Sequence, residues 1–264
     1  MSADMYARTP KIGPGARSAL LVAVVAGAAL CAPLTALPAS EEVHASARQA
    51  LVRVIESDVR RTSRFLDKAE LDSRVMRVMG KVPRHEFVPD YLVDRAYENR
   101  PLPIGYGQTI SQPYIVAIMT DLLALPADCK VLEVGTGSGY QAAVLAELCA
   151  EVFTIEVVEP LGIEAGRRLG RLGYENVTTR LGDGYYGWPE KGPFDAIIVT
   201  AVASHLPPPL LEQLRPGGKL IIPVGGQFTT QQLVLVEKST ESRISTRQIL
   251  PVLFVPLTGG HDQP

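Results

Sequence analysis

The sequence has few of the residues from which metal clusters and disulfide frameworks are built. Its 264 residues include three cysteines and four histidines, and both sets are scattered along the chain. We therefore expect neither a metal site nor a disulfide framework. Cys129 and Cys149 flank one predicted strand–helix unit, and we expect them to be buried thiols.

Basic residues are not in excess either. Lys and Arg number 26 against 28 Asp and Glu, which gives a net charge of -2. Because proteins that bind phosphate backbones usually carry a clear basic excess, no nucleic-acid partner is expected. Apolar residues are abundant: 46% of the chain is hydrophobic and 20% is charged, the balance of a globular chain that buries a core.

The first 45 residues differ from the rest of the chain. Residues 19–40 carry no charge, and within them 19–32 form an unbroken apolar stretch that follows three basic residues. A basic flank, a short apolar run and a small-residue end are typical of a secretory signal peptide, and cleavage after Ala39 or Ala45 is compatible with this pattern. The apolar run is shorter than the roughly 20 residues of a membrane-spanning helix. Residues 1–45 are predicted to be a signal-like or anchoring extension.

The remainder is predicted to have two parts, residues 46–126 and 127–264. In the first, apolar residues at helical spacing predict two or three helices, and the proline-rich stretch from Val82 to Gly107 predicts an irregular segment or arm. In the second, short apolar runs alternate with helical stretches, the pattern of βαβ units in a parallel sheet. The runs lie at 130–134, 152–157, 177–180, 195–200 and 219–224, and two more, at 232–237 and 249–257, are expected to pair antiparallel at one edge. We predict an α/β fold with a doubly wound, mostly parallel seven-stranded sheet and an N-terminal helical extension.

The sharpest motif is the glycine-dense turn Gly135–Gly139, which directly follows the predicted strand 130–134. Glycines permit positive φ and close approach of a ligand, and doubly wound sheets bind ligands at the carboxyl ends of their strands. The spacing is G-x-G-x-G with Glu133 two residues before it, whereas a dinucleotide fingerprint reads G-x-G-x-x-G or A. An NAD-dependent oxidoreductase is therefore disfavoured.

Two more acidic residues follow the next two predicted strands. Glu156 lies about 20 residues beyond the glycines, where an acid can accept from both hydroxyls of a ribose. Asp183, in Leu181-Gly182-Asp183-Gly184, can accept from an exocyclic adenine amine. Either acid alone could be a solvated loop residue or a helix N-cap. Acids at three successive strand ends instead favour a site for an adenosine-bearing cofactor.

With these residues in place, the stretch Gly105–Pro113, GYGQTISQP, resembles the signature of the protein-L-isoaspartate O-methyltransferases. The resemblance runs from about Val75 to Leu257, and four further blocks match in the same order: Val82–Arg84, Phe87–Pro89, Pro193–Thr200 and Phe254–Thr258. Two positions depart from the family: Glu156 is followed by Val-Val where Arg-Ile is expected, and Leu253 stands where a basic residue is common. The resemblance implies a Rossmann-like fold.

The resemblance also implies an activity. S-adenosylmethionine would donate a methyl group, without a metal, to the free α-carboxylate of L-isoaspartyl residues in damaged proteins, with D-aspartyl residues as a second substrate type, and so initiate repair. Ser111 matches the residue treated as catalytic. The implied cofactor residues are Thr109, Ile110, Gln112, Glu133, Gly135, Gly137, Gly139, Glu156, Asp183, Gly184 and, as a weaker match, Thr258. Age-damaged proteins and peptides are the expected partners of a monomeric enzyme.

Two other functions share part of this pattern. A methyltransferase that uses S-adenosylmethionine on a small molecule or RNA would share the glycine turn and the acids, but the block 109–113 would be unexplained. An inactive cofactor-binding interaction module would need neither Ser111 nor all three acids. Because the cofactor is made and consumed in the cytoplasm, a cytoplasmic location is expected, whereas residues 19–40 favour export or anchoring.

Overall fold

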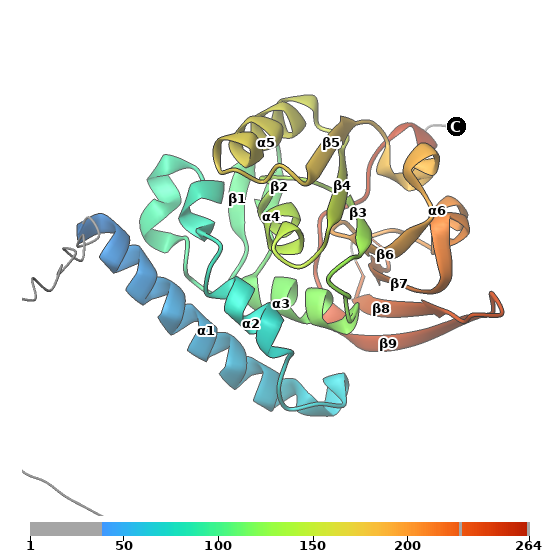
Figure 1. Ribbon diagram of the computed structural model, residues 1–264, viewed down its shortest axis with the longest axis horizontal. Coiled ribbons are helices and arrows are strands. Elements are labelled where there is room, and N and C mark those ends of the chain that lie inside the picture. The colour runs from blue at the N-terminus through green and yellow to red at the C-terminus, as the bar shows by residue number, and fades with distance from the viewer. Residues whose placement is uncertain (1–38, 227–228, 263–264) are drawn as a thin grey trace, which may run out of the picture. The chain divides into compact units, whose positions relative to one another are not determined.

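A twisted sheet of seven strands organises the computed structural model, which describes residues 39–226 and 229–262 (Figure 1). The strand order is β5-β4-β3-β6-β7-β8-β9. The strands are β3 (Lys130–Val134), β4 (Glu151–Glu156), β5 (Val177–Leu181), β6 (Phe194–Val199), β7 (Leu214–Val224), β8 (Gln231–Lys238) and β9 (Ile244–Val252). The five strands from β5 to β7 run parallel, and β8 and β9 add antiparallel at one edge. The predicted seven-stranded sheet is confirmed.

The position of the last strand differs from the prediction. It was expected at 249–257 but spans Ile244–Val252, because a turn at 239–243 pairs Lys238 with Ile244 and draws the polar residues that follow into the hairpin. The predicted end of the run leaves the sheet, and Pro256 forms only an isolated bridge with Val202. This exit brings the segment after β9 over the carboxyl ends of the parallel strands.

The sheet carries an apolar core on each face, because neighbouring residues of a strand point to opposite sides. In β3, Val131 belongs to a cluster built with the helices α1 to α5, whereas Leu132 belongs to a second cluster that includes Leu210 of α6. The helices are α1 (Ala39–Leu66), α2 (Ser73–Met79), α3 (Pro113–Leu122), α4 (Tyr140–Ala146), α5 (Glu159–Arg171) and α6 (Pro208–Gln213). The first cluster contains residues from both predicted parts, 46–126 and 127–264.

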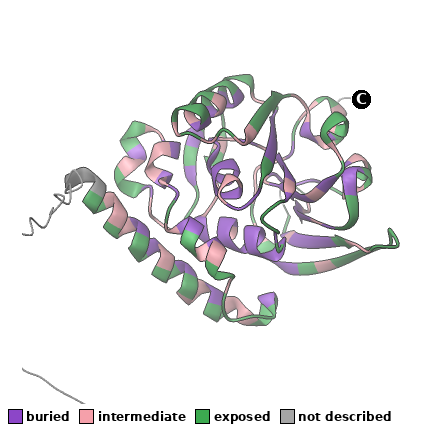
Figure 2. Ribbon diagram, in the orientation of Figure 1, coloured by how far each residue is buried: buried purple, intermediate pink, exposed green. Residues whose placement is uncertain are grey.

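The long helix α1 packs on α2, α3 and β9 (Figure 1). Its buried residues Leu51, Ile55 and Val59 recur every four positions and form the apolar stripe that faces the core, while its outer side is exposed (Figure 2). The signal-like stretch 19–32 lies outside the described residues. Among the helices that the structure describes, none is long and apolar enough to cross a bilayer.

The proline-rich stretch contains a hairpin that the sequence did not predict. Strand β1 (Leu102–Gly105) pairs antiparallel with β2 (Gln108–Ile110) through a two-residue turn in which Tyr106 and Gly107 both have positive φ, 53° and 73°. Hairpin turns with two positive φ values are usually marked by Asn-Gly or a similar pair. Here the first position is a tyrosine, which is unusual at positive φ, so the sequence carried no recognisable turn signal. We call the segment from β1 to Pro113 the substrate arm.

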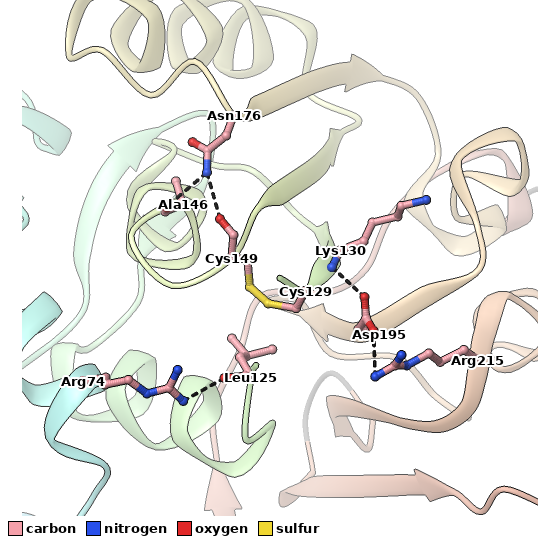
Figure 3. Close-up of a disulfide and its surroundings, with 9 residues drawn as sticks. All are labelled: Arg74, Leu125, Cys129, Lys130, Ala146, Cys149, Asn176, Asp195 and Arg215. Atoms are coloured by element: carbon pink, nitrogen blue, oxygen red, sulfur yellow. Dashed lines mark hydrogen bonds and ion pairs between the residues drawn. A yellow bond between two sulfur atoms is a disulfide. The ribbon is translucent and has the colours of Figure 1, made fainter. Parts of the chain in front are cut away.

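Cys129 and Cys149 form a disulfide, so the expectation of two buried thiols is wrong (Figure 3). The two residues precede β3 and β4, which are neighbouring parallel strands paired from Lys130 and Glu151. A sequence separation of 20 residues therefore becomes a Cα–Cα distance of 4.8 Å. Both cysteines are buried, and the bridge joins the two ends of the β3–α4 unit that carries the glycine turn.

We expect loss of this bridge to lower thermal stability. A cross-link that closes a loop of this length stabilises by about 3 kcal/mol, which in a domain of this size corresponds to roughly 6–12 °C in Tm. The double variant Cys129→Ser/Cys149→Ser should therefore melt that far below the oxidised protein in calorimetry. The number of free thiols, measured by alkylation and mass spectrometry, serves as the control. Equal melting temperatures with the wild-type disulfide intact would contradict the prediction.

Candidate active site

The candidate site is a cleft at the carboxyl ends of the parallel strands, where the strand order reverses between β3 and β6. The substrate arm closes it from one side. The cleft is lined by Gln108, Thr109, Ile110, Ser111, Val116, Glu133, Gly135, Thr136, Gly137, Ser138, Tyr140, Gln141, Glu156, Thr200, Ala201 and Val255. A second hollow shares Gln108, Gly135 and Ala201 with it and extends to Val157, Gly184 and Thr258.

The glycine turn directly follows β3, and its first position has no room for a side chain. Gly135 has a φ of 95°, and a Cβ there would lie 2.5 Å from the hydroxyl of Thr200. That hydroxyl donates to the Gly135 carbonyl at 2.7 Å, so the end of β6 fixes the start of the turn. Gly139 has a different role: it lines neither hollow, and a Cβ there would press on Leu169 of α5 at 3.2 Å.

Glu156, at the end of β4, faces the glycine turn from the neighbouring strand. Its carboxylate is buried and accepts hydrogen bonds from the backbone N–H of Gly137 at 2.7 Å and of Val158 at 2.9 Å. Each carboxylate oxygen can accept a second hydrogen bond. The acid predicted to bind a ribose therefore lies in the cleft, held in place by two backbone donors, with acceptor capacity left for two hydroxyls.

Glu133 is fully buried at the floor of the cleft. One of its oxygens accepts from the Thr154 hydroxyl at 2.6 Å, and the other, Oε1, has no hydrogen-bond partner among the described residues. Burial, with a smaller contribution from the nearby Glu156 carboxylate, raises the pKa of Glu133 to about 8 despite the bond from Thr154. At neutral pH this carboxyl group is therefore mostly protonated, and a cation bound beside it would lower its pKa and favour the carboxylate.

This raised pKa predicts how stability changes with pH. Because the pKa of Glu133 is about 8 in the folded chain and 4.5 ordinarily, the native state retains a proton that the unfolded state releases between these values. Its contribution is complete below about pH 4.5 and is lost as the pH rises through about 8. Glu133→Gln carries no such proton. We expect this variant to match the wild type near pH 5 and to melt a few degrees higher near pH 9 in calorimetry without ligand; a constant difference across this range would contradict the assignment.

Ser111 lies where the cleft meets a neighbouring groove. The groove has a volume of about 450 Å³, and its walls are mostly apolar. It shares Thr109, Ser111, Thr200 and Val255 with the cleft and also contains the predicted residue Gln112. No group of the described residues hydrogen-bonds to the Ser111 hydroxyl, so no histidine activates it there as in a hydrolase. The hydroxyl is therefore available to a ligand that spans the cleft and the groove.

Comparison with known proteins matches residues 63–262 to the protein-L-isoaspartate(D-aspartate) O-methyltransferase family. The chain belongs to this family. It is 60% identical to protein-L-isoaspartate O-methyltransferase 2 of Syntrophobacter fumaroxidans, over 92% of this chain and 95% of that one. It is 56% identical to protein-L-isoaspartate O-methyltransferase 1 of Cupriavidus necator, over 96% and 97%.

Solved structures of the same kind support the assignment. A protein-L-isoaspartate O-methyltransferase superposes with a TM-score of 0.70 at 29% identity, covering 80% of this chain, which spans 66% of that structure. A candidate member from Plasmodium falciparum, in complex with S-adenosyl-L-homocysteine, superposes with a TM-score of 0.66 at 26% identity, covering 81% and 98%. The Rossmann-like methyltransferase fold is therefore confirmed, and the family uses S-adenosylmethionine.

The cleft of this methyltransferase fits that cofactor. The Oε1 of Glu133 is a buried oxygen with no hydrogen-bond partner among the described residues, and an ammonium group bound beside it would favour loss of the proton that Glu133 holds at neutral pH. Gly135 and Gly137 line the cleft without side chains, so a ligand can approach the backbone of the turn closely. Among the described residues, no group of three or more His, Cys, Asp or Glu side chains could hold a metal ion. The acceptors and the space suit a cationic, ribose-bearing ligand.

The structure engages Asp183 differently from the other predicted residues. Its carboxylate caps the backbone N–H of Tyr185 at 3.0 Å and accepts from His261, whose backbone N–H lies at 3.0 Å and whose Nδ1 lies at 2.8 Å. Burial opposes ionisation, yet these bonds hold the pKa of Asp183 below its usual range. Asp183 lines neither hollow, whereas its neighbour Gly184 does. Its predicted contact with adenine stays a prediction.

The sequence analysis missed several lining residues of the methyltransferase, among them Thr200, Tyr140 and Gln141. Thr200 is the residue after β6, so the end of a fourth parallel strand was the signal that could have found it. Tyr140 and Gln141 begin α4 directly after the glycine turn, and Gln141 bonds to Thr120 of α3 at 3.0 Å. No local pattern indicated that these two residues line the cleft.

Proposed function

We propose that this chain methylates the free α-carboxylate of L-isoaspartyl residues in damaged proteins and peptides, with D-aspartyl residues as a second substrate type. The main support, beyond family membership, is the position of Ser111 at the junction of the cofactor cleft and the groove. A methyl acceptor in the groove and a donor in the cleft would meet at its hydroxyl. S-adenosylmethionine supplies an electrophilic methyl group on a sulfonium.

Different residues of the chain bind different parts of the cofactor. Glu156 accepts from the ribose hydroxyls, and the unpartnered oxygen of Glu133 accepts from the ammonium group. Gly184 and Thr258 border the second hollow, next to which we place the adenine. We propose Asp183 as the acceptor of the adenine amine, with its carboxylate held in place by the hydrogen bond to His261.

The reaction needs no general base. A side-chain-like carboxylate has a pKa of about 4, so the acceptor is already an anion at neutral pH. Catalysis therefore comes from alignment and from removal of water around the nucleophile. The Ser111 hydroxyl donates to one carboxylate oxygen and leaves the other aimed at the methyl group. Because the transfer neutralises both charges, strong stabilisation of the separated ions would slow the step, and a single neutral donor suits it.

A methyl-transfer assay tests the function. Labelled methyl groups should pass to an isoaspartyl peptide as a base-labile ester, and not to the same peptide with ordinary aspartate or to RNA. Transfer to RNA alone would favour the RNA methyltransferase alternative, and cofactor binding without any transfer would favour an inactive module. Light scattering during gel filtration tests the proposed monomeric state.

We also propose a cytoplasmic location, because the cofactor is made and consumed there. The Cys129–Cys149 bridge and the signal-like segment 19–40 favour an oxidising compartment instead. Cleavage after Ala45 would remove His44, whose ring stacks on that of His85 at 3.9 Å. N-terminal sequencing of the mature protein from fractionated cells, with thiols blocked before lysis, decides between the two. A processed, oxidised protein outside the cytoplasm would contradict the proposal.

A further inference from the structure

Arg84 is a buried cation that the proposed chemistry does not use. It belongs to the short 3-10 helix η1 (Arg84–Phe87), and its side chain is fully inaccessible to solvent. Burial lowers its pKa to about 10, which leaves it charged at neutral pH. Within the described part of the chain, no carboxylate forms an ion pair with it. A buried charge without a counter-ion is costly, so its contacts require an explanation.

Those contacts lead to the substrate arm. The Nε of Arg84 donates to the backbone carbonyl of Ala96 at 2.9 Å, and Nη2 donates to the backbone carbonyl of Ser111 at 2.8 Å. Charge-assisted hydrogen bonds are stronger than neutral ones, and the planar guanidinium fixes the direction of both. The backbone of the candidate catalytic serine is therefore tied to a rigid, buried group.

The same side chain also contacts the cofactor side of the site. The guanidinium carbon lies 4.7 Å from the centre of the Tyr140 ring, within the range of a cation–π interaction. Tyr140 is the first residue of α4, directly after the glycine turn, and it lines the cofactor cleft. One side chain thus touches both the segment that carries Ser111 and the helix that begins at the glycine turn.

We propose that Arg84 is a positioning residue, which fixes Ser111 relative to the glycine turn so that methyl donor and acceptor are held in line. This inference rests on the proposed function of Ser111. Arg84 itself lines neither the cleft nor the groove and does not touch the reacting groups. Its effect passes through the backbone of residue 111, where a shift of about 1 Å can cost about a hundredfold in rate.

Kinetics of Arg84→Gln and Arg84→Lys test this role. We expect Arg84→Gln to lower kcat on an isoaspartyl peptide about 10- to 100-fold, while the Kd for S-adenosyl-L-homocysteine stays within about threefold. Arg84→Lys keeps the charge and one donor direction and should recover part of the loss; it also serves if the glutamine variant does not fold. The matched control is Arg74→Gln, because Arg74 likewise donates to a backbone carbonyl, that of Leu125 at 2.8 Å (Figure 3), and lines neither the cleft nor the groove. This control should keep the wild-type kcat.

A double-mutant cycle separates this inference from the proposed function. If Arg84 acts by placing the Ser111 hydroxyl, Arg84→Gln should cost little more once Ser111→Ala has removed that hydroxyl. Independent, multiplying losses would overturn the inference and leave the role of Ser111 standing. Unchanged kcat in both Arg84 variants, or losses in kcat and cofactor affinity of equal size together with a lower Tm, would also overturn it. A Ser111→Ala enzyme of normal activity would instead refute the proposed role of Ser111.

Discussion

Ser111→Ala should lower turnover of an isoaspartyl peptide about a hundredfold, because the variant loses the only neutral donor proposed to orient the acceptor carboxylate. The Kd for the cofactor should change little, since the ribose and ammonium contacts lie on Glu156 and Glu133. Turnover at saturating substrate and isothermal titration with S-adenosyl-L-homocysteine measure the two effects separately.

Ser204 provides a matched control for this experiment. Its hydroxyl bonds to His205 at 3.0 Å and lines neither the cofactor cleft nor the adjoining groove. Ser204→Ala should therefore retain wild-type kinetics. If Ser111→Ala stayed within about twofold of the wild-type turnover, alignment by this hydroxyl would be excluded as a source of catalysis.

Glu156→Gln should weaken cofactor binding about 10- to 100-fold. The amide keeps one acceptor but turns its NH2 group toward a backbone N–H, either that of Gly137 or that of Val158, where the carboxylate accepted a bond. It also loses the negative charge that strengthens hydrogen bonds from the ribose. Equilibrium dialysis with S-adenosyl-L-homocysteine measures the loss, and kcat at saturating cofactor should fall far less than affinity.

Glu164→Gln is the matched control, since Glu164 lies exposed on α5. Equal affinities for the Glu156 and Glu164 variants would mean that Glu156 only shapes the turn. A fall in kcat with unchanged affinity would place its contribution in the transition state and not in cofactor binding.

The parallel strands and the glycine turn could be predicted because they have strong local signals. Continuous apolar runs such as AIIV in β6 are typical of strands covered on both faces, and their carboxyl ends meet at one edge. This rule alone predicts that Glu133 and Glu156 lie close together, and both line the cleft. The same rule did not place Asp183 in the cleft, because its carboxylate accepts hydrogen bonds from Tyr185 and His261 and lines neither hollow.

The remaining features depend on tertiary contacts that no local pattern encodes. The Cys129–Cys149 bridge follows from the pairing of β3 with β4, which makes residues 20 positions apart neighbours. The Arg84 contact with Ser111 spans 27 residues and is made to a backbone carbonyl, which leaves no trace in side-chain patterns. The engagement of Asp183 by His261 likewise depends on how the chain leaves β9.

That exit path has a practical side. Because Gly259 packs against Asp183 and the backbone N–H of His261 bonds to it, a group attached after residue 262 would begin next to a contact of the residue proposed to accept from the adenine amine. Biochemical work on cofactor binding therefore calls for a chain without a tag at that end.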